Sequence, residues 1–483
     1  MRSQPERFDL VVIGGGPGGS TASTLVAMQG HKVLLLEKEK FPRHQIGESL
    51  LPVTIHALCP LLGVDEAIKK AGFVKKFGAL LRWGKNEKPW HVSFNMAPDL
   101  EKAGADYAYQ VERSRFDAIL LDNARQRGVE VREQQTVKDV VTEDDRVTGV
   151  RYVDQSGAER VASAQFVVDA SGNGSPLQRS VGERIYSQFF RNVALYCYFN
   201  GAKRLSGVLS GNVISATFPE GWLWFIPLSD TLTSVGAVIS REHARELQND
   251  HDSTMRGFIE SCPIINDLLS GATRVTDGQY GTFRIRKDYS YINSSFWRPG
   301  LSLVGDAACF VDPIFSTGVH LATYSGLLAA RSVNTVLSGA LDEAACFVEF
   351  ERRYRAEFEN IYRFLLAFYD FHQDEQSYFW TARKILNTTE RANAAFVRLI
   401  SGISTVESNI FELGSRVSAH LKAFESGADQ EGVAKANRLV QSHPTDLRIP
   451  GVSDDHREPE RPRDEGGLIP SADGLHWTMP SNA

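Results

Sequence analysis

The most regular pattern of apolar and polar positions lies near the N-terminus. Residues 8–13 (FDLVVI) form a predominantly apolar run, small and apolar residues continue to Gly30, and residues 33–37 (VLLLE) form a second apolar run. Short apolar runs bounded by glycine predict buried parallel strands, and the segment between them has the length of a helix. We therefore predict a strand–helix–strand unit over residues 8–37.

Glycines occupy the predicted turn between this strand and helix. Gly14, Gly16 and Gly19 have the spacing G-x-G-x-x-G, and Glu37 ends the second strand. In a dinucleotide site Gly14 allows the tight turn, Gly16 lets backbone N–H groups approach a pyrophosphate, and Gly19 allows close helix–strand packing. Glu37 would accept hydrogen bonds from ribose hydroxyls, and the helix N-terminus favours the negative phosphates. A glycine-rich turn without a ligand is the alternative, but the register of all the elements favours a dinucleotide site.

The remaining pattern predicts an α/β protein with several regions. A helix that begins at residue 113 and is closed by Gly128 is followed by a meander of short strands and a return strand at 166–172, while 185–285 alternates apolar and aromatic positions as antiparallel strands do. An aromatic stripe beyond residue 340 has helical spacing and fits core packing, and the charged, proline-containing end fits a flexible tail. We predict these regions: a dinucleotide-binding domain whose first segment spans 1–184, with the meander at 136–164; an antiparallel substrate-side sheet at 185–285; the second segment of the domain at 286–340; a helical region at 341–450; and a flexible tail at 451–483.

The composition and charge of the chain argue against several classes of function. The chain has 483 residues, 42% of them hydrophobic and 23% charged, which is typical of a globular protein. A net charge of −6 argues against nucleic acid as a partner. The polar N-terminus and the lack of a long apolar run argue against a signal peptide and a membrane span, so we expect a cytoplasmic protein. The cysteines are scattered, odd in number and without metal-ligand spacing, so neither a disulfide framework nor a metal site is expected; they are Cys59, Cys197, Cys262, Cys309 and Cys346.

Three separated segments resemble the flavoprotein family typified by the aromatic hydroxylases. They are GGGPGGS at 14–20, RSRFD at 113–117 and VGDAACFVDP at 304–313. The resemblance implies an aromatic-hydroxylase-like fold with FAD as cofactor. It places Asp306 at the ribityl hydroxyls, Arg113 along the cofactor, and Arg43 among the cofactor-binding residues. For Asp306 a simple helix-capping role is the alternative.

The stretch GWLWFIP at 221–227 distinguishes this chain from the hydroxylases. It matches W-x-W-x-I-P, the signature of flavin-dependent halogenases, at Trp222, Trp224, Ile226 and Pro227. Alternate residues of a strand share one face, so the two indoles should stand side by side. The resemblance makes them a stiff barrier between flavin and substrate, whereas simple core filling is the commoner role of buried aromatics.

Other segments resemble the same family and imply the chemistry. They are FPRHQIGESLLP at 41–52, KKFG at 75–78 and DPIFSTG at 312–318. In that family reduced FAD and oxygen give a flavin hydroperoxide, chloride converts it to hypochlorous acid, and a lysine receives this oxidant. Lys76 matches that lysine, although Lys75 is adjacent. The backbone N–H groups of Thr317 and Gly318 would hold the chloride.

A lysine suits this role because of its two protonation states. Its ammonium can hydrogen-bond hypochlorous acid, and its neutral amine can form a chloramine if burial lowers the pKa. The sequence does not choose between these two forms. A solvated surface role is the usual one for lysine, so the motif alone carries this assignment.

The substrate and partners follow from the subgroup that the chain resembles. The nearest subgroup acts on phenols or pyrroles tethered to carrier proteins, as the chondramide-type tyrosyl halogenases do. Tryptophan halogenases have a glutamate before the serine of DPIFSTG, whereas Phe315 precedes Ser316 here, which argues against free tryptophan. We read His320 as an ordinary helix residue rather than a base. A basic run would suit an acidic carrier, although a solvated face is its commoner role; it comprises Lys69, Lys70, Lys75, Lys76, Arg82, Lys85 and Lys88.

The sequence therefore predicts an FAD-dependent halogenase of specialised metabolism. Because the chain has no second dinucleotide fingerprint for NAD(P)H, a separate flavin reductase would supply the reduced FAD. An aromatic hydroxylase or an isoprenoid-type reductase of the same fold is the main alternative. A non-catalytic FAD-binding protein is a further one.

Overall fold

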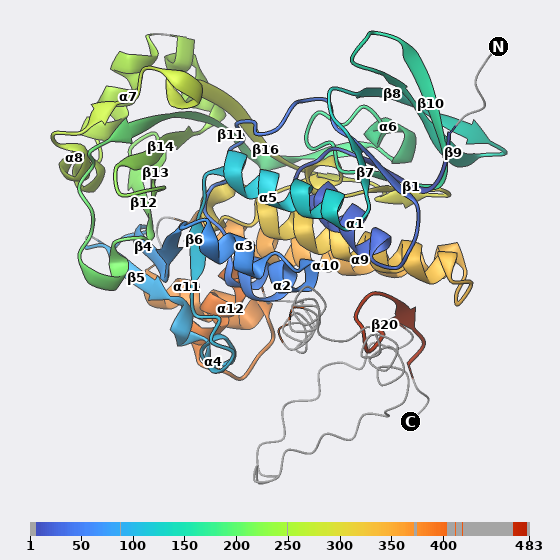
Figure 1. Cartoon of the computed structure of the whole chain (residues 1–483). Helices are drawn as coiled ribbons and strands as arrows, with labels where there is room; N and C mark the ends of the chain where they lie inside the picture. The colour runs from blue at the N-terminus through green and yellow to red at the C-terminus, as the bar shows by residue number, and fades with distance from the viewer. Residues whose placement is uncertain are drawn as a thin grey trace.

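Two sheets with helices packed against them form the body of the protein (Figure 1). The computed structural model describes residues 6–86, 88–248, 250–370, 374–402, 411, 418 and 467–480. The dinucleotide-type sheet lies at one end and the second sheet at the other, and the long strands β11 (Arg184–Asn200) and β16 (Arg284–Asn293) lie between them. This is the mixed α/β fold that the sequence predicts.

The predicted strand–helix–strand unit is present. β1 (Glu6–Ile13), α1 (Pro17–Ala27) and β2 (Val33–Leu36) follow one another, and the two strands pair in parallel. They lie inside an eight-stranded sheet with the path β17-β18-β10-β1-β2-β7, to which β8 and β9 attach beside β10. The further strands are β7 (Glu130–Arg132), β8 (Thr136–Glu143), β9 (Arg146–Val153), β10 (Glu159–Asp169), β17 (Trp297–Arg298) and β18 (Leu301–Leu303).

The single strand β10 covers two strands that the sequence pattern predicts separately. The pattern predicts the third strand of the meander and the return strand at 166–172 as distinct elements, but β10 runs through both. Its residues 159–163 pair antiparallel with β9, and its residues 162–169 pair parallel with β1. The segment ERVASAQFVVD contains no glycine, proline or asparagine, so nothing in it ends the strand.

The second sheet has nine strands and separates two cores. Trp222, Trp224 and Ile226 of β13 face the main core, while Leu223 and Phe225 face the helices α7 (His251–Glu260) and α8 (Pro263–Leu269). Its path is β19-β16-β11-β14-β13-β12-β4-β5, with β15 beside β11. The other strands are β4 (Gly78–Arg82), β5 (Trp90–Ser93), β12 (Val213–Phe218), β13 (Gly221–Pro227), β14 (Leu232–Ile239), β15 (Thr273–Arg274) and β19 (Cys309–Phe310).

This sheet extends beyond the predicted range of 185–285. β4 and β5 come from the first domain segment, and β4 pairs in parallel with β12, so the sheet is mixed. Short strands flanked by charged residues carry little pattern of their own. Their membership in the sheet is decided by the distant strand β12, which the local sequence does not reveal.

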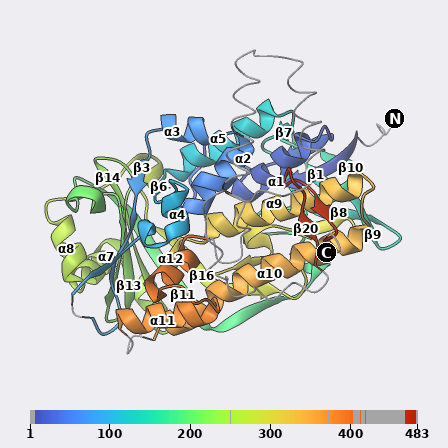
Figure 2. The same cartoon turned by 90° about the horizontal axis from the view of Figure 1, so that it is seen from below.

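Helices cover the core between the sheets. α9 (Gly318–Leu337) and α10 (Glu343–Phe368) run alongside each other, and α11 (Glu375–Ile385) and α12 (Ala392–Ile400) pack beyond the end of α10 (Figure 2). The aromatic stripe of α10 is buried, as core packing requires. The rest of the predicted helical region, except residues 411 and 418, lies outside the described residues. The remaining helices are α2 (Cys59–Leu62), α3 (Asp65–Lys70), α4 (Pro98–Lys102), α5 (Arg113–Gln126) and α6 (Gln178–Val181).

The end of the chain corrects the prediction of a flexible tail over 451–483. Residues 451–466 lie outside the described residues, but β20 (Ile469–Pro470) and β21 (Trp477–Thr478) form a small hairpin. Trp477 is 1% exposed, and its Nε1 donates to Ser332 Oγ at 3.0 Å. Its backbone N–H donates to Thr335 Oγ1 at 2.8 Å. One aromatic side chain docked on α9 therefore orders a segment that follows a charged run.

The five cysteines are buried free thiols. Among the described residues, no cluster of His, Cys, Asp and Glu has the size and spacing of a metal site. No helix in the described part of the chain has the length and apolar character needed to cross a membrane.

The docked hairpin leads to a stability prediction. Trp477→Ala should lower the free energy of unfolding by about 3–5 kcal/mol, because it leaves a cavity on α9 and removes the hydrogen bond from Nε1 to Ser332 Oγ. Trp380→Ala is the matched control, since that tryptophan is 50% exposed. Denaturant unfolding of the FAD-free proteins measures both changes. Equal midpoints for Trp477→Ala and the wild type would show that the hairpin adds nothing to stability.

Candidate functional site

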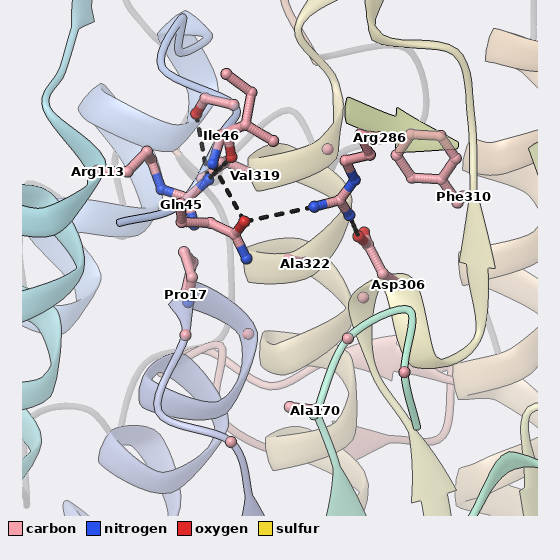
Figure 3. A pocket seen from close by; sticks show the side chains of 18 of the residues that line it. Pro17, Gln45, Ile46, Arg113, Ala170, Arg286, Asp306, Phe310, Val319 and Ala322 are labelled. Carbon is pink, nitrogen blue, oxygen red and sulfur yellow. Dashed lines mark hydrogen bonds and ion pairs between the residues drawn. The ribbon is translucent and has the colours of Figure 1, made fainter. Parts of the chain in front are cut away.

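A cavity of about 560 Å³ lies between the dinucleotide-type domain and the second sheet. The glycine turn and Glu37 line one end, and Trp222, Trp224 and Ile226 line the other. Figure 3 shows Arg286 pointing between Gln45 and Asp306, with Arg113 beside Ile46. The cavity thus connects the two groups of residues that the sequence motifs single out.

The glycine turn has the shape that a pyrophosphate requires. Gly14 has φ +97°, and a Cβ at Gly19 would lie 1.9 Å from the carbonyl oxygen of Gly14. Glu37 is held at the turn by backbone donors, because Oε2 accepts from Gly15 N at 2.6 Å and Oε1 from Glu39 N at 2.8 Å. Gly16 precedes the first turn of α1, whose N–H groups favour an anion.

Two arginines meet at one buried carboxylate. Arg113 donates from Nε to Asp117 Oδ1 at 2.7 Å and from one guanidinium nitrogen to Ile46 O at 2.7 Å. Arg43 donates to Asp117 Oδ2 at 3.1 Å. Asp117 is fully buried. Arg113 therefore holds the segment 43–49 along the cavity, and the sequence patterns did not predict the role of Asp117.

Asp306 lies in the middle of the cavity wall. Arg286 donates to its Oδ2 at 3.2 Å and to Gln45 Oε1 at 3.4 Å. Burial raises the pKa of Asp306, and the charge of Arg286 opposes that shift. A carboxylate at this position suits a chain of ribityl hydroxyls, so the cavity fits FAD, with Glu37 at the ribose and the glycine turn at the pyrophosphate. Arg286 and Gln45 carried no recognisable sequence signal.

The segment 312–318 closes the cavity beside the tryptophans. Asp312 Oδ1 accepts from Ile314 N at 3.1 Å, and Asn192 donates to Oδ2 at 2.9 Å. Thr317 caps the 20-residue helix α9, which begins at Gly318. Among the described residues, none hydrogen-bonds the buried Oγ1 of Thr317. An unpaired hydroxyl at a helix N-terminus fits a small anion such as chloride.

Lys76 is buried, unlike its neighbour Lys75. It ends β3 (Val74–Lys76), which pairs with β6 (Ala108–Gln110). Its Nζ donates to Ser49 Oγ at 2.8 Å and to Leu50 O at 3.0 Å. Burial lowers the pKa of Lys76 to about 7. Since Ser49 lines the cavity, the amine lies one hydrogen bond behind the cavity wall.

The two tryptophans form a fixed part of the wall. Their ring centroids are 6.2 Å apart, and Trp222 Nε1 donates to Tyr369 Oη at 2.7 Å. Trp224 Nε1 donates to Ser234 Oγ at 3.2 Å, and a Cβ at Gly236 would lie 2.2 Å from the Trp224 ring. Hydrogen bonds and tight packing thus hold both indoles in place. Pro227 ends β13 and is buried next to this wall.

Comparison with known proteins now decides the family. The model of the tryptophan halogenase family matches residues 96–421, and that of FAD-dependent oxidoreductases matches 9–180. This chain belongs to the flavin-dependent tryptophan halogenase family. The halogenase is an FAD enzyme, and its fold is that of the family, as the sequence predicts.

Individual relatives span most of this halogenase. The myxobacterial chondrochloren halogenase structure is 51% identical with a TM-score of 0.77, covering 98% of this chain and 100% of that chain. Tryptophan 2-halogenase of Chondromyces crocatus is 34% identical over 90% of this chain and 81% of its own length. The 1H-pyrrole-2-carbonyl-[peptidyl-carrier protein] chlorinase of Pseudomonas fluorescens is 31% identical over 75% of this chain and 83% of its own length.

The predicted basic run is dispersed in the halogenase structure. Lys76 is buried, Lys69 lies 3.2 Å from Glu66, and Lys85 lies 3.5 Å from Asp374. The run therefore does not form one uninterrupted positive face, in agreement with its commoner role as solvated charges.

His320 lies in the core, as an ordinary helix residue can. It sits fully buried in α9. Its Nε2 lies 2.9 Å from Glu357 Oε1 of α10, which is also fully buried. The sequence pattern did not predict this polar pair between the two long helices.

Tyr369 is a further residue that the sequence patterns placed elsewhere. It ends the aromatic stripe of α10, which we assigned to core packing. Its hydroxyl instead accepts from Trp222 and hydrogen-bonds Asp312, which caps the segment 312–318. In the sequence, Tyr369 differs from the other aromatic residues of the stripe only in its place at the end of the stripe, where α10 stops.

The geometry of the glycine turn leads to a binding prediction. Gly19→Ala should weaken FAD binding at least about tenfold, because the new Cβ forces Gly14 out of its turn. Gly257→Ala is the control, since nothing lies within 4 Å of a Cβ there. Titration of the oxidised cofactor by flavin fluorescence measures both. Unchanged affinity in Gly19→Ala would show that the turn does not hold the pyrophosphate.

Proposed function

We propose that this halogenase chlorinates a tyrosyl-type phenol tethered to a carrier protein, and that Lys76 passes the chlorine to the ring. The observation that carries this proposal is the buried amine of Lys76 behind the cavity wall. The peptidyl-carrier chlorinase supports a carrier-tethered substrate, because its name gives one, and the choice of a tyrosyl-type phenol rests on the resemblance to the chondramide-type halogenases. Phe315, in place of a glutamate, supports a ring that needs little help to lose its proton.

The tryptophan wall and Lys76 would have different roles in the reaction. Bound and reduced FAD supplies the electrons with which oxygen and chloride give hypochlorous acid. Trp222 and Trp224 would keep the aromatic substrate from the flavin, while a molecule as small as hypochlorous acid passes along the cavity. Thr317 and Gly318 would hold the chloride at the start of α9. Glu37, Arg43, Arg113 and Asp306 would hold the cofactor.

Lys76 has two ways to use the oxidant. Its ammonium can donate a hydrogen bond to the oxygen of hypochlorous acid and polarise the O–Cl bond. Its neutral amine can instead form an N–Cl bond and release water, and the ring then takes the chlorine and gives its proton to the nitrogen. A pKa of about 7 populates both forms at neutral pH.

Two protein partners complete the proposal. A separate reductase would supply reduced FAD, because the chain has one dinucleotide fingerprint and no second one for NAD(P)H. A carrier protein would present the substrate, as the name of the Pseudomonas fluorescens relative says of that enzyme's substrate.

Paired lysine variants test the relay. Lys76→Ala should bind FAD normally and still oxidise reduced FAD, but ring chlorination should fall about 100-fold or more. Lys75→Ala is the matched control, because that side chain is exposed and its Nζ lies over the Tyr107 ring. Mass spectrometry of the product measures the chlorination. Normal chlorination by Lys76→Ala would refute the relay.

A substrate panel tests the rest of the proposal. Tyrosyl-loaded carrier, pyrrolyl-loaded carrier, free tyrosine and free tryptophan are each offered with reduced FAD, oxygen and chloride. We expect chlorinated tyrosyl carrier and no product from free tryptophan. Chlorination of free tryptophan would contradict the proposed substrate and favour the activity named in the Chondromyces crocatus relative. An oxygenated product without halide would favour the hydroxylase alternative.

A further inference from the structure

Glu48 is a buried carboxyl group on the cavity wall that no motif assigned. It is 1% exposed and lines the same cavity as Trp224 and Ser49. Its backbone oxygen accepts from Val111 N at 2.7 Å, which fixes the residue against the end of β6. Oε1 accepts from the Tyr198 hydroxyl at 2.9 Å. Within the described chain, no donor reaches Oε2 with hydrogen-bond geometry.

A hydrogen-bonded chain leads from Glu48 back to the cavity. Tyr198 Oη lies 2.8 Å from His44 Nε2, and His44 is half-buried and lines the cavity. Because the Tyr198 hydroxyl donates to Glu48, its oxygen is left to accept from His44 Nε2–H. Tyr198 itself is fully buried. The three groups therefore form a hydrogen-bonded series with one end at a partly exposed imidazole.

The environment favours a proton on Glu48 near neutral pH. Burial raises the pKa of Glu48 to about 7, and hydrogen bonds from Ser234 and Tyr198 and the charge of Arg113 limit the rise. The charge of Glu112 acts in the same direction as burial.

His44 is neutral under the same conditions. Burial lowers its pKa to about 4, and Arg284, Arg113 and Arg43 act in the same direction. A neutral imidazole can donate from Nε2 while Nδ1 accepts a proton.

The reaction itself needs such a proton. Counted in its neutral form, reduced FAD gives two electrons and two protons to oxygen. With one chloride ion and one further proton, the products are oxidised FAD, water and hypochlorous acid. Chloride enters as an anion and leaves bound to oxygen, so one proton is consumed for each oxidant formed.

We propose that Glu48 donates this proton from Oε2, and that Tyr198 and His44 return a proton to it from the cavity. The donation leaves Glu48 as a carboxylate. Tyr198 then gives its hydroxyl proton to Oε1 and takes one from His44 Nε2, and His44 takes a proton from the solvent at Nδ1. Rotation of the carboxyl group, which moves its proton to the cavity side, and exchange of the imidazole proton from Nδ1 to Nε2 through the solvent restore the starting arrangement. The inference rests on the proposed function only in taking oxidation of chloride as the reaction of this cavity.

Glu48 and Lys76 would act in different steps, although the residue next to Glu48 contacts Lys76. Ser49 follows Glu48 in the chain, and its hydroxyl accepts the hydrogen bond from Lys76. Glu48 would serve the formation of the oxidant, and Lys76 would serve its delivery to the ring. A chemical trap for hypochlorous acid measures the first step without the second.

Glu48→Gln tests the proposal in the FAD-loaded enzyme. The amide keeps the shape and the acceptor for Tyr198 but has no acidic proton. We expect trapped hypochlorous acid to fall about 100-fold at pH 7. In the wild type the yield should fall about tenfold per pH unit well above pH 7, since the protonated fraction falls that way, and Glu48→Gln should lack this limb.

An infrared measurement gives a readout that does not depend on turnover. Oxidised, FAD-loaded wild type should show a protonated-carboxyl C=O band that disappears as pH rises through about 7. The band should be absent in Glu48→Gln. A wild-type band that does not titrate in this range would overturn the proposal even if the variant failed to fold.

Two further variants separate donation from return of the proton. Tyr198→Phe keeps Glu48 but breaks the series, so the first turnover should proceed normally and later turnovers should slow. Glu112→Gln is the matched carboxylate control, because Glu112 accepts from Tyr280 and does not line the cavity. It should keep the trapped yield at pH 6 and move the alkaline limb to lower pH, since its charge helps to raise the pKa of Glu48.

The outcomes distinguish this proposal from the proposed function. If the wild type yields no trapped hypochlorous acid, the proposed function fails. If Glu48→Gln yields it at the wild-type rate with the same alkaline limb, the role of Glu48 fails and the proposed function stands.

Discussion

The buried carboxylate of Asp117 is the contact on which the rest of the site depends. It binds Arg113 through both oxygens and also accepts from Arg43, and Arg113 in turn holds the carbonyl of Ile46. Gly47 then turns the chain with φ +99°. The segment fixed in this way presents Glu48 to the cavity and Ser49 to Lys76. Removing one partner from a buried ion pair costs about 3–5 kcal/mol, so this geometry is held firmly.

A second network joins the tryptophan wall to the segment 312–318. Trp222 donates to Tyr369, and Tyr369 hydrogen-bonds Asp312, which also accepts from Asn192 and from the backbone of Ile314. The indole wall and the start of α9 are therefore held by one set of polar contacts. Because the set is buried, a shift of the tryptophan would leave polar groups unpaired, which makes the wall stiff.

Local patterns predicted those features of the molecule that local chemistry decides. The glycine turn, the position of Glu37 after the second strand and the common face of Trp222 and Trp224 follow from spacing along a few residues. The structure has that turn, that strand end and that shared face, while the binding roles of these residues stay predictions. The burial of Lys76 depends on Ser49 and Leu50, and the Trp477 hairpin depends on Ser332, 145 residues away. Glu48 and Tyr198 are 150 residues apart. No periodicity in the sequence brings such pairs together, so they could be found only in the folded chain.

Burial of Lys76 and Glu48 lowers the stability of the fold. The pH dependence of each loss follows from the direction of that group's pKa shift. The pKa of Lys76 is lowered from 10.5 to about 7 on folding, so between those values the folded chain binds fewer protons and its stability falls as pH falls. The pKa of Glu48 is raised from 4.5 to about 7, so its contribution falls as pH rises across that range. Near pH 7 both losses of stability are close to their full size, and this pH is also close to the pKa of each group. The ion pairs of Asp117, which hold the segment that carries Glu48 and Ser49, are among the contacts that offset these losses.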